Sequence, residues 1–220
     1  MIRFNVALDT GPMSVAAITV HGDVSRCQHY DVDMSRWGPD ARGRLAQAAL
    51  ELYGERGFDQ TTAAEIAHRA GLTERTFFRH FADKREVLFA GSAELQKLLV
   101  DATASAPMSA APIDAVTAAL MAAGDVFNNE RRSYARERRA VIAANAELLE
   151  RELIKMASLA SAIADALRRR GVSEPAASLT AEAGIAVFRV TFERWVDKAS
   201  DQDWRALVRG SLEQLRVLVS

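Results

Sequence analysis

Phenylalanines and basic residues crowd together in one stretch of the chain, 70–89, which reads AGLTERTFFRHFADKREVLF. Between residues 68 and 85 there are five arginines and lysines against two acidic residues, so the local charge is +3 before histidine is counted. Such cations contact phosphates, and an arginine can also donate two hydrogen bonds to a guanine. The types and spacing of these residues therefore favour a surface that binds nucleic acid.

Two short helices are expected to position these cations. Thr62 and Glu65 have the spacing of a capping box, in which each side chain accepts a hydrogen bond from the backbone of the other residue. A helix is therefore expected over 63–70, and Thr73 can cap a second one over 74–81. Two short capped helices joined by a turn with a glycine are typical of a helix-turn-helix, whose second helix enters the DNA major groove.

The helical period separates the rings from the cations. One face is expected to pack into a small core that contains Leu45, Leu52, Phe58, Ile66, Ala67, Ala70, Leu72, Phe77 and Phe81. The other face keeps Arg75, Thr76, Arg79 and His80 available to a partner.

Helical periodicity continues from Pro39 to the end of the chain, and strand-like alternation is scarce. We therefore expect an all-α fold, with a three-helix head that contains the helix-turn-helix and a larger helical body. A small-residue, proline-rich segment at 102–112 is a plausible connection between them. The other helices are expected at about 40–56, 84–100, 113–127, 131–144, 146–170, 175–198 and 203–219.

The composition narrows the class of protein. The 220 residues are 49% hydrophobic, carry a formal charge of −1 and include one cysteine, Cys27. The chain can therefore bury a sizeable core, cannot form an internal disulfide, and must attract nucleic acid through a local patch. No apolar run reaches the ~20 residues that span a bilayer, so we expect a cytoplasmic protein without a membrane partner.

Residues 1–36 differ in composition from the rest of the chain. Three interpretations are open: a strand-like arm, a disordered tail, or residues upstream of a start at Met34; we favour the last two. His21, Cys27 and His29 could be drawn as a metal site, but their spacing fits no compact zinc pattern. We expect no metal and no cofactor.

The helix expected over 175–198 has two apolar faces. One side carries Ile185, Phe188, Phe192 and Trp195, and another side carries Ala183, Ala186 and Val190. One of these stripes can pack on the body of its own chain, while the other can meet a partner. Two such helices at a carboxyl terminus predict a symmetric dimer built as a four-helix bundle. The alternative is that both faces are covered within one chain. The predicted dimer interface comprises Ala183, Ala186, Val190, Trp204, Val208, Ser211 and Leu215.

An ordered series of motifs runs from residue 45 to residue 88. It comprises Ala-Ala-Leu-Glu-Leu-Tyr at 48–53, Gly57-Phe58, Thr61-Thr62, Glu65-Ile66-Ala67, Ala70-Gly71-Leu72-Thr73, Thr76-Phe77-Phe78, Phe81, Asp83-Lys84 and Val87-Leu88. In this series the chain resembles the tetracycline repressor (TetR) family of bacterial transcription regulators. Beyond it the resemblance is only that of a helical body, because ligand domains in this family diverge widely.

The resemblance implies roles for single residues. Thr62 and Lys84 look like phosphate contacts. Candidates for base and phosphate contact on the recognition helix are Thr73, Arg75, Thr76, Arg79 and His80. For His80, an ordinary surface histidine is the alternative. Arg42 and Arg44 either steady the DNA backbone or play no part, and the basic run at 131–139 is more in keeping with a solvated helix face than with a second nucleic-acid site.

Two positions depart from the pattern that the family often shows. Arg75 stands where a glycine is frequent, and its long side chain can reach the O6 and N7 atoms of guanine. Phe78 stands where a tyrosine is frequent, and it has no hydroxyl to donate to a phosphate. We therefore interpret Phe78 as packing, or as an apolar contact with sugar or a thymine methyl group.

The resemblance predicts a DNA-binding domain at 37–88 and an effector-binding and dimerisation domain at 89–220. It implies a homodimeric regulator, a repressor that binds a near-palindromic DNA operator in the bacterial cytoplasm, at the nucleoid. The resemblance also implies that this regulator responds to a small-molecule effector. Candidate walls of the effector pocket are Leu99, Met121, Phe127, Tyr134, Met156, Phe188 and Phe192.

An enzyme and a protein-interaction module are the two alternatives to a DNA-binding regulator. An enzyme is not expected, because no compact nucleophile and base, metal-ligand spacing or glycine-rich phosphate loop is present. A protein-interaction module that has lost DNA binding is disfavoured by the intact caps and the basic patch.

Overall fold

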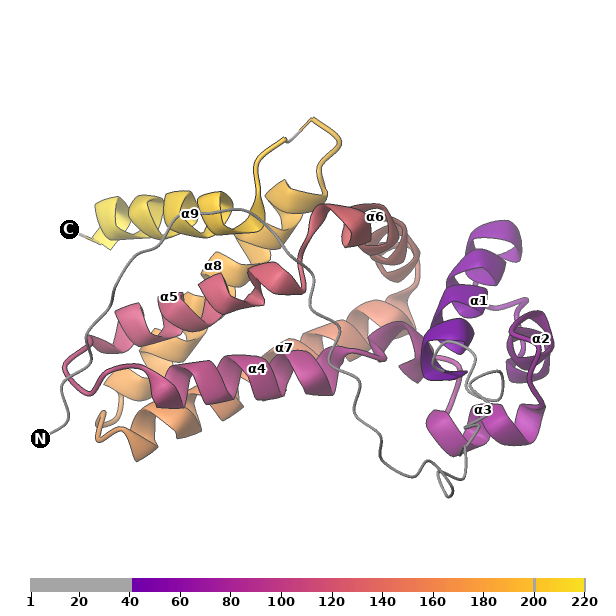
Figure 1. The fold of residues 1–220 in the computed structure, drawn as a ribbon, viewed down its shortest axis with the longest axis horizontal. Coiled ribbons are helices and arrows are strands. Elements are labelled where there is room, and N and C mark those ends of the chain that lie inside the picture. Colours follow the sequence, from indigo (N-terminus) through magenta and orange to yellow (C-terminus); the bar gives the residue numbers. More distant parts are fainter. Residues whose placement is uncertain (1–40, 200, 220) are drawn as a thin grey trace, which may run out of the picture. The chain divides into compact units, whose positions relative to one another are not determined.

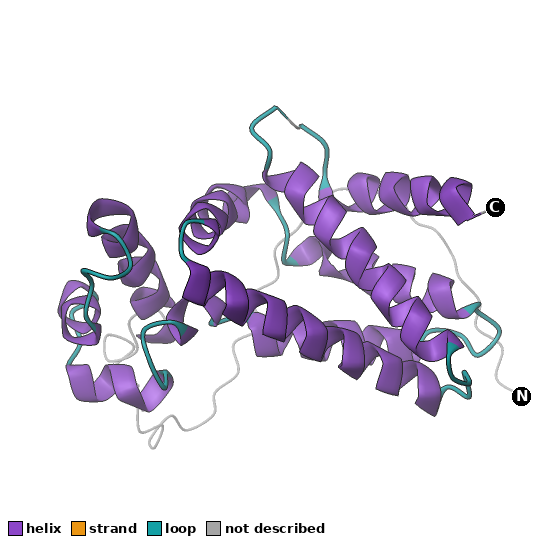
Figure 2. Ribbon diagram, turned by 180° about the vertical axis from the view of Figure 1, so that it is seen from behind, coloured by secondary structure: helices purple, strands orange, loops and turns teal. Residues whose placement is uncertain are grey.

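The computed structural model describes residues 41–199 and 201–219, which form helices joined by turns and contain no strand (Figure 1). The prediction of an all-α fold is therefore confirmed for this part of the chain; Figure 2 shows the same helices from behind. The predicted extension at 1–36, including His21, Cys27, His29 and Met34, lies outside the described residues.

The first three helices are α1 (Ala41–Arg56), α2 (Ala63–Arg69) and α3 (Glu74–His80). Both predicted caps are confirmed. The Thr62 hydroxyl accepts the Glu65 N–H over 3.2 Å, and the Glu65 carboxylate accepts the Thr62 N–H over 2.9 Å. The Thr73 hydroxyl accepts the Thr76 N–H over 3.2 Å. These bonds satisfy N–H groups that have no partner inside the helices, and they set where α2 and α3 begin.

A glycine with positive φ follows each of the first two helices. Gly57 has φ of 87° after α1, and Gly71 has φ of 67° in the turn between α2 and α3. Residues with a Cβ rarely adopt this left-handed conformation, whereas glycine does so without steric penalty. The turn of the helix-turn-helix therefore depends on Gly71, and the Leu72 N–H closes it by donating to the Ala67 carbonyl over 2.8 Å.

The fourth helix differs from the prediction of one helix over 84–100. A short 3-10 turn, η2 (Glu86–Phe89), comes first, and α4 (Ser92–Ser105) begins only after it. Asp83 starts this turn, because one carboxylate oxygen accepts the N–H groups of Arg85 and Glu86 over 2.7 and 3.2 Å. Gly91 then separates the two helices, since a glycine is unfavourable inside a helix.

The remaining helices agree with the predicted ranges to within a few residues. They are α5 (Pro112–Ala122), a 3-10 turn η3 (Ala123–Asp125), α6 (Asn129–Ala143), α7 (Ala146–Arg169), α8 (Ala176–Val196) and α9 (Trp204–Val219). In Figure 1, α4 lies beside α5 and α7, while α8 packs on α5, α7 and α9. The connection between α4 and α5 is shorter than the predicted segment 102–112, because α4 continues to Ser105.

An ion-pair cluster joins η2 to the body helices α6 and α7. Both Arg151 and Lys155 donate to the Glu86 carboxylate, the lysine over 3.1 Å. The partly buried guanidinium of Arg138 donates to the Leu88 carbonyl over 2.5 Å. Burial raises the pKa of Glu86, but the hydrogen bonds from Arg151 and Lys155 outweigh this effect, and the pKa lies below its usual value. The segment η2, which follows the three-helix head, is therefore held against α6 and α7 by ion pairs as well as by packing.

Gly184 lets α8 approach α5 closely. A Cβ atom built on this buried glycine would lie 2.4 Å from the Val116 Cγ1 atom, well inside van der Waals contact. We expect Gly184→Ala to lower the free energy of unfolding by about 1–3 kcal/mol, because the strain of overpacking exceeds the gain of ~1 kcal/mol in helix propensity. Urea denaturation would measure this loss.

The matched control for this substitution removes the clashing methyl groups. Val116→Ala leaves a small cavity on its own, but the Gly184→Ala methyl group can fill part of it. The double variant should therefore be more stable than the sum of the two single losses predicts. Strictly additive losses would show that the two side chains do not compete for the same space.

Candidate nucleic-acid interface

The recognition helix α3 presents one buried and one exposed face. Phe77 and, just after the helix, Phe81 are buried in the core of the head, as predicted. On the opposite face Arg75, Phe78 and Arg79 are exposed, with Phe78 54% accessible to solvent. The predicted separation of rings and cations is therefore present, except that one ring stays on the cationic side.

Arg75 and Arg79 differ from the other cations of the basic stretch. Among the described residues neither has a hydrogen bond or an ion pair. Arg69 donates to Glu55 over 2.8 and 3.0 Å, and Arg85 donates to Asp83 over 2.7 and 3.1 Å. The two arginines of α3 are therefore the cations of this stretch that can bind a partner without breaking contacts within the described protein.

The small polar residues of α3 are partly occupied by capping. The hydroxyl groups of Thr73 and Thr76 lie 3.0 Å apart, and Thr73 also accepts the Thr76 N–H. His80 is half-buried, and its Nε2 atom finds no hydrogen-bond partner among the described residues. The base or phosphate contacts assigned to these three residues stay predictions.

Thr62 begins α2 with its polar groups already engaged. Both its N–H and its hydroxyl donate to the Glu65 carboxylate over 2.9 Å. Hydrogen bonds from the backbone and the hydroxyl of Thr62 lower the pKa of this carboxyl, which also pairs with Arg56 over 2.8 Å. A phosphate that contacts Thr62 must therefore displace Glu65, and the contact stays a prediction.

Lys84 holds the loop after α1 in place. Its ammonium group donates to the carbonyl groups of Phe58, Asp59 and Thr61 over 2.9, 3.3 and 3.1 Å, and it lies 4.3 Å from the centre of the Phe58 ring. The Tyr53 hydroxyl in turn donates to the Lys84 carbonyl over 2.6 Å. Since an ammonium group has three donors, a phosphate contact would compete with these bonds, and it stays a prediction.

We expect Lys84→Met to destabilise the head by about 1.5–3 kcal/mol, because three backbone carbonyls lose a charged donor. The measurement is chemical denaturation of the purified protein, with Arg85→Met as the matched control. Arg85 is the next residue and a cation too, but its main partner is the exposed carboxylate of Asp83. Equal losses for the two variants would contradict a structural role for Lys84.

Arg42 and Arg44 lie near the start of α1. The Arg42 guanidinium stacks 5.2 Å from the centre of the Phe81 ring. Arg44 is half-buried and lines, with Gln47, Glu51 and Arg69, a groove of about 380 Å³ between α1 and α2. Arg42 therefore has a packing role, and contact of either residue with a DNA backbone stays a prediction.

The basic run of α6 forms a solvated face only in part. Arg132 donates to the Gln202 carbonyl and Arg136 to the Val196 carbonyl, each over 2.7 Å. Arg138 binds the Leu88 carbonyl, as described above. Arg131 and Arg139 are exposed, as a solvated face predicts, whereas the other three arginines tie α6 to neighbouring segments of the protein.

The predicted pocket residues do not all meet. Six of them belong to the body core: Leu99, Met121, Phe127, Met156, Phe188 and Phe192. Tyr134 lies instead in the second core, which joins α6 to the head. Phe127 stacks on Trp204 with ring centres 4.1 Å apart and makes edge contacts with Phe188, Phe192 and Trp195. These rings are in direct contact with one another, and the effector pocket stays a prediction.

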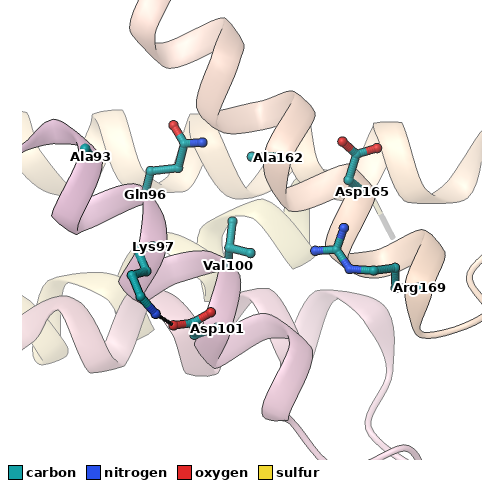
Figure 3. A pocket seen from close by; sticks show the side chains of 8 residues that line it. All are labelled: Ala93, Gln96, Lys97, Val100, Asp101, Ala162, Asp165 and Arg169. Carbon is teal, nitrogen blue, oxygen red and sulfur yellow. Dashed lines mark hydrogen bonds and ion pairs between the residues drawn. The ribbon is translucent and has the colours of Figure 1, made fainter.

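Sequence reasoning missed two features of the body. The indole N–H of the buried residue Trp195 has no acceptor among the described residues. Figure 3 shows a separate groove of about 310 Å³ between α4 and α7, lined by Ala93, Gln96, Lys97, Val100, Asp101, Ala162, Asp165 and Arg169. No residue of this groove was among the predicted pocket walls, because its side chains are mainly polar and resemble an ordinary solvated surface.

The predicted dimer residues divide into two groups. Trp204, Val208 and Ser211 lie in the core of their own chain, where the Trp204 indole donates to the Leu120 carbonyl over 2.7 Å. They are therefore not available to a second copy. The remaining members keep some accessible surface: Ala183, Ala186, Val190 and Leu215.

The described residues contain neither a candidate membrane span nor a candidate metal site. No helix there has the length and apolar character needed to cross a membrane. Within the same residues no group of three or more histidine, cysteine, aspartate or glutamate side chains is arranged to hold a metal ion.

Comparison with known proteins identifies both parts of the chain. Residues 45–90 match the family model of bacterial regulatory proteins, tetR family, and residues 110–219 match that of the MftR C-terminal domain. The regulator TcmR of Streptomyces glaucescens, an HTH-type transcriptional regulator, is 35% identical over 81 residues, which are 37% of this chain and 36% of TcmR. Rv2250c of Mycobacterium tuberculosis, an uncharacterized HTH-type transcriptional regulator, is 29% identical over 94 residues, 43% of this chain and 48% of its own length.

Solved structures share the fold at low sequence identity. A putative transcriptional regulator from Pseudomonas aeruginosa PAO1 is 18% identical, with a TM-score of 0.58 over 86% of this chain and 95% of its own. SmeT in complex with triclosan is 19% identical, with a TM-score of 0.56 over 79% and 90%.

The curated relatives are matched over about a third to a half of their own length, whereas the second family model alone covers 110–219 of the 220 residues. Together with the capped helix-turn-helix at 63–80, these matches show that the chain belongs to the TetR family of bacterial regulatory proteins.

Proposed function

We propose that this chain is a ligand-responsive DNA-binding transcriptional regulator, a repressor that binds a near-palindromic operator as a homodimer in the bacterial cytoplasm, at the nucleoid. The observation that carries the proposal is the pair of exposed arginines on a capped recognition helix, Arg75 and Arg79, which have no hydrogen bond or ion pair within the described residues. They lie four residues apart and so on one face, the face that a helix-turn-helix turns toward base edges.

The relatives support regulation and repression. TcmR and Rv2250c are both named as HTH-type transcriptional regulators. SmeT, whose fold this chain shares, is described as the repressor of the Stenotrophomonas maltophilia multidrug efflux pump SmeDEF. The alternatives are an enzyme and an interaction module without DNA binding, and the exposed arginines favour neither of them.

The accessible face of α8 supports dimerisation. Leu179 and Val190 are 66% and 49% exposed, and Ala183 and Ala186 lie between them at helical spacing. On α9, Val217 is 63% exposed. A second copy would cover these apolar side chains in a symmetric four-helix arrangement and would place two recognition helices in successive major grooves.

The body core supports an effector of amphipathic chemistry. Phe127 and Phe192 are only partly buried, so the aromatic cluster reaches the surface, and the Trp195 N–H can donate to an acceptor on a ligand or to a water molecule. By linkage, an effector that binds the free form more tightly weakens DNA binding by the same factor. A tenfold effect requires about 1.4 kcal/mol of coupling.

Selection of bound fragments from a random duplex pool tests the proposal. The purified full chain should enrich an inverted repeat whose two halves are about one helical turn apart. A folded dimer that enriches no sequence across a range of salt concentrations would contradict sequence-specific DNA binding. That result would favour a protein-interaction module that has lost DNA binding.

A further inference from the structure

Phe78 is the one phenylalanine of α3 that the described protein does not bury. Phe77 beside it is fully buried and Phe81 is 4% exposed, whereas more than half of the Phe78 side chain contacts solvent. Exposing a phenyl ring forgoes the free energy that its burial would provide. A ring left uncovered on the helix that carries the free arginines is therefore positioned for the same partner as those arginines.

The orientation of the ring is set by its neighbour. Phe77 and Phe78 make an edge-to-face contact, with ring centres 5.3 Å apart and planes at 81°. Because the Phe77 ring is held in the core, this contact limits how Phe78 can turn. At 100° per residue, Phe78 lies about 60° around the helix from Arg75, on the side away from Arg79, so its neighbour on the exposed face is Arg75, three residues earlier.

DNA offers few groups that an apolar ring can recognise. A phosphate needs a hydrogen-bond donor or a cation, which Phe78 lacks. In the major groove most base-edge groups are polar, and the apolar exception is the 5-methyl group of thymine. The deoxyribose is also apolar, but contact with it would be the same for every sequence.

We propose that Phe78 determines sequence specificity by packing on the 5-methyl group of one thymine in each operator half-site. This inference rests on the proposed function, and it adds a base identity to it. Burying one methyl group stabilises a complex by ~0.8 kcal/mol, which corresponds to about fourfold in affinity for each half-site and about fifteenfold for a dimer on two half-sites.

Replacement of thymine by uracil tests the proposal, because uracil differs only by the missing methyl group. The selected operator is synthesised with uracil at one symmetric pair of thymines at a time, and affinity is measured by fluorescence anisotropy at fixed salt. One pair is expected to show a loss of about fifteenfold with the full-length protein. Phe78→Ala should bind the two operators equally, and Phe78→Tyr, which keeps the ring, should retain the difference.

The outcomes separate this inference from the function on which it rests. If the operator is bound and Arg75→Ala weakens it, but no uracil substitution matters, the ring contacts sugar and the proposal fails while DNA reading stands. The same holds if Phe78→Ala keeps the full sensitivity to uracil. If no operator is bound at all, both proposals fail together.

Discussion

Replacing Arg75 and Arg79 together with alanine is expected to weaken operator binding by at least about a hundredfold. A bidentate contact between an arginine and a guanine provides ~1–3 kcal/mol of discrimination, and every dimer carries two recognition helices. The loss should appear as relaxed sequence preference as well as lower affinity. Alanine favours helices, and neither arginine has an ion pair or a hydrogen bond within the described residues, so α3 should stay folded.

Arg69→Ala is the matched control for this double variant. Arg69 lies in the same head and has the same charge, but it is bound to Glu51 and Glu55. Its removal should therefore change operator affinity far less. Binding of the selected operator and of a scrambled duplex would be measured for all three proteins. A similar loss on both duplexes for the double variant would show that Arg75 and Arg79 contact only phosphate.

Trp204→Ala is expected to cause the largest loss of stability, about 3–5 kcal/mol. The side chain is 1% exposed, stacks on Phe127 and donates to the Leu120 carbonyl. Alanine would leave a cavity beside the rings of Phe127, Phe188 and Trp195 and a carbonyl without its donor. Trp204→Phe should recover part of this loss, because it restores most of the ring but not the N–H.

The same experiment separates a core role for Trp204 from a role at the dimer interface. Val190→Ala is the control, because Val190 is 49% exposed on α8 and is not one of the buried residues of the body core. Unfolding would be followed in urea at several protein concentrations. The Trp204 loss should be the same at every concentration, whereas the Val190 effect should depend on how much dimer is present. A Trp204 loss that vanishes on dilution would place this residue between subunits.

Local signals in the sequence were sufficient for most helices. The capping pairs at Thr62 and Thr73 act within three residues, so their hydrogen bonds can be predicted from spacing alone. The structure of the segment after Asp83 was harder to predict from local signals. Its pattern also suits a helix start, and only the turn around Glu86 and the position of Gly91 show that the chain makes a 3-10 turn first.

Side-chain partners that are distant in sequence could not be predicted. Lys84 looks like a free cation until the loop at 58–61 is seen to surround its ammonium group. Trp204 and Val190 both lie on apolar stripes, and periodicity cannot tell which stripe is covered by α5 and which stays open. The exposed arginines of α3 were predictable because the helical period places them on the face opposite Phe77, which packs into the core.

The engagement of Arg69, Lys84 and Arg85 with protein groups has a consequence for the time that the molecule spends on chromosomal DNA. Binding to arbitrary sequence comes from neutralised phosphates, and each one adds about 0.9 to the slope of log affinity against log salt. A head with three of its cations held by carboxylates and carbonyls has fewer to offer the bulk of the chromosome. If the chain binds an operator as proposed, we expect fewer copies to be sequestered on other sequence, so that fewer molecules are needed to occupy the operator.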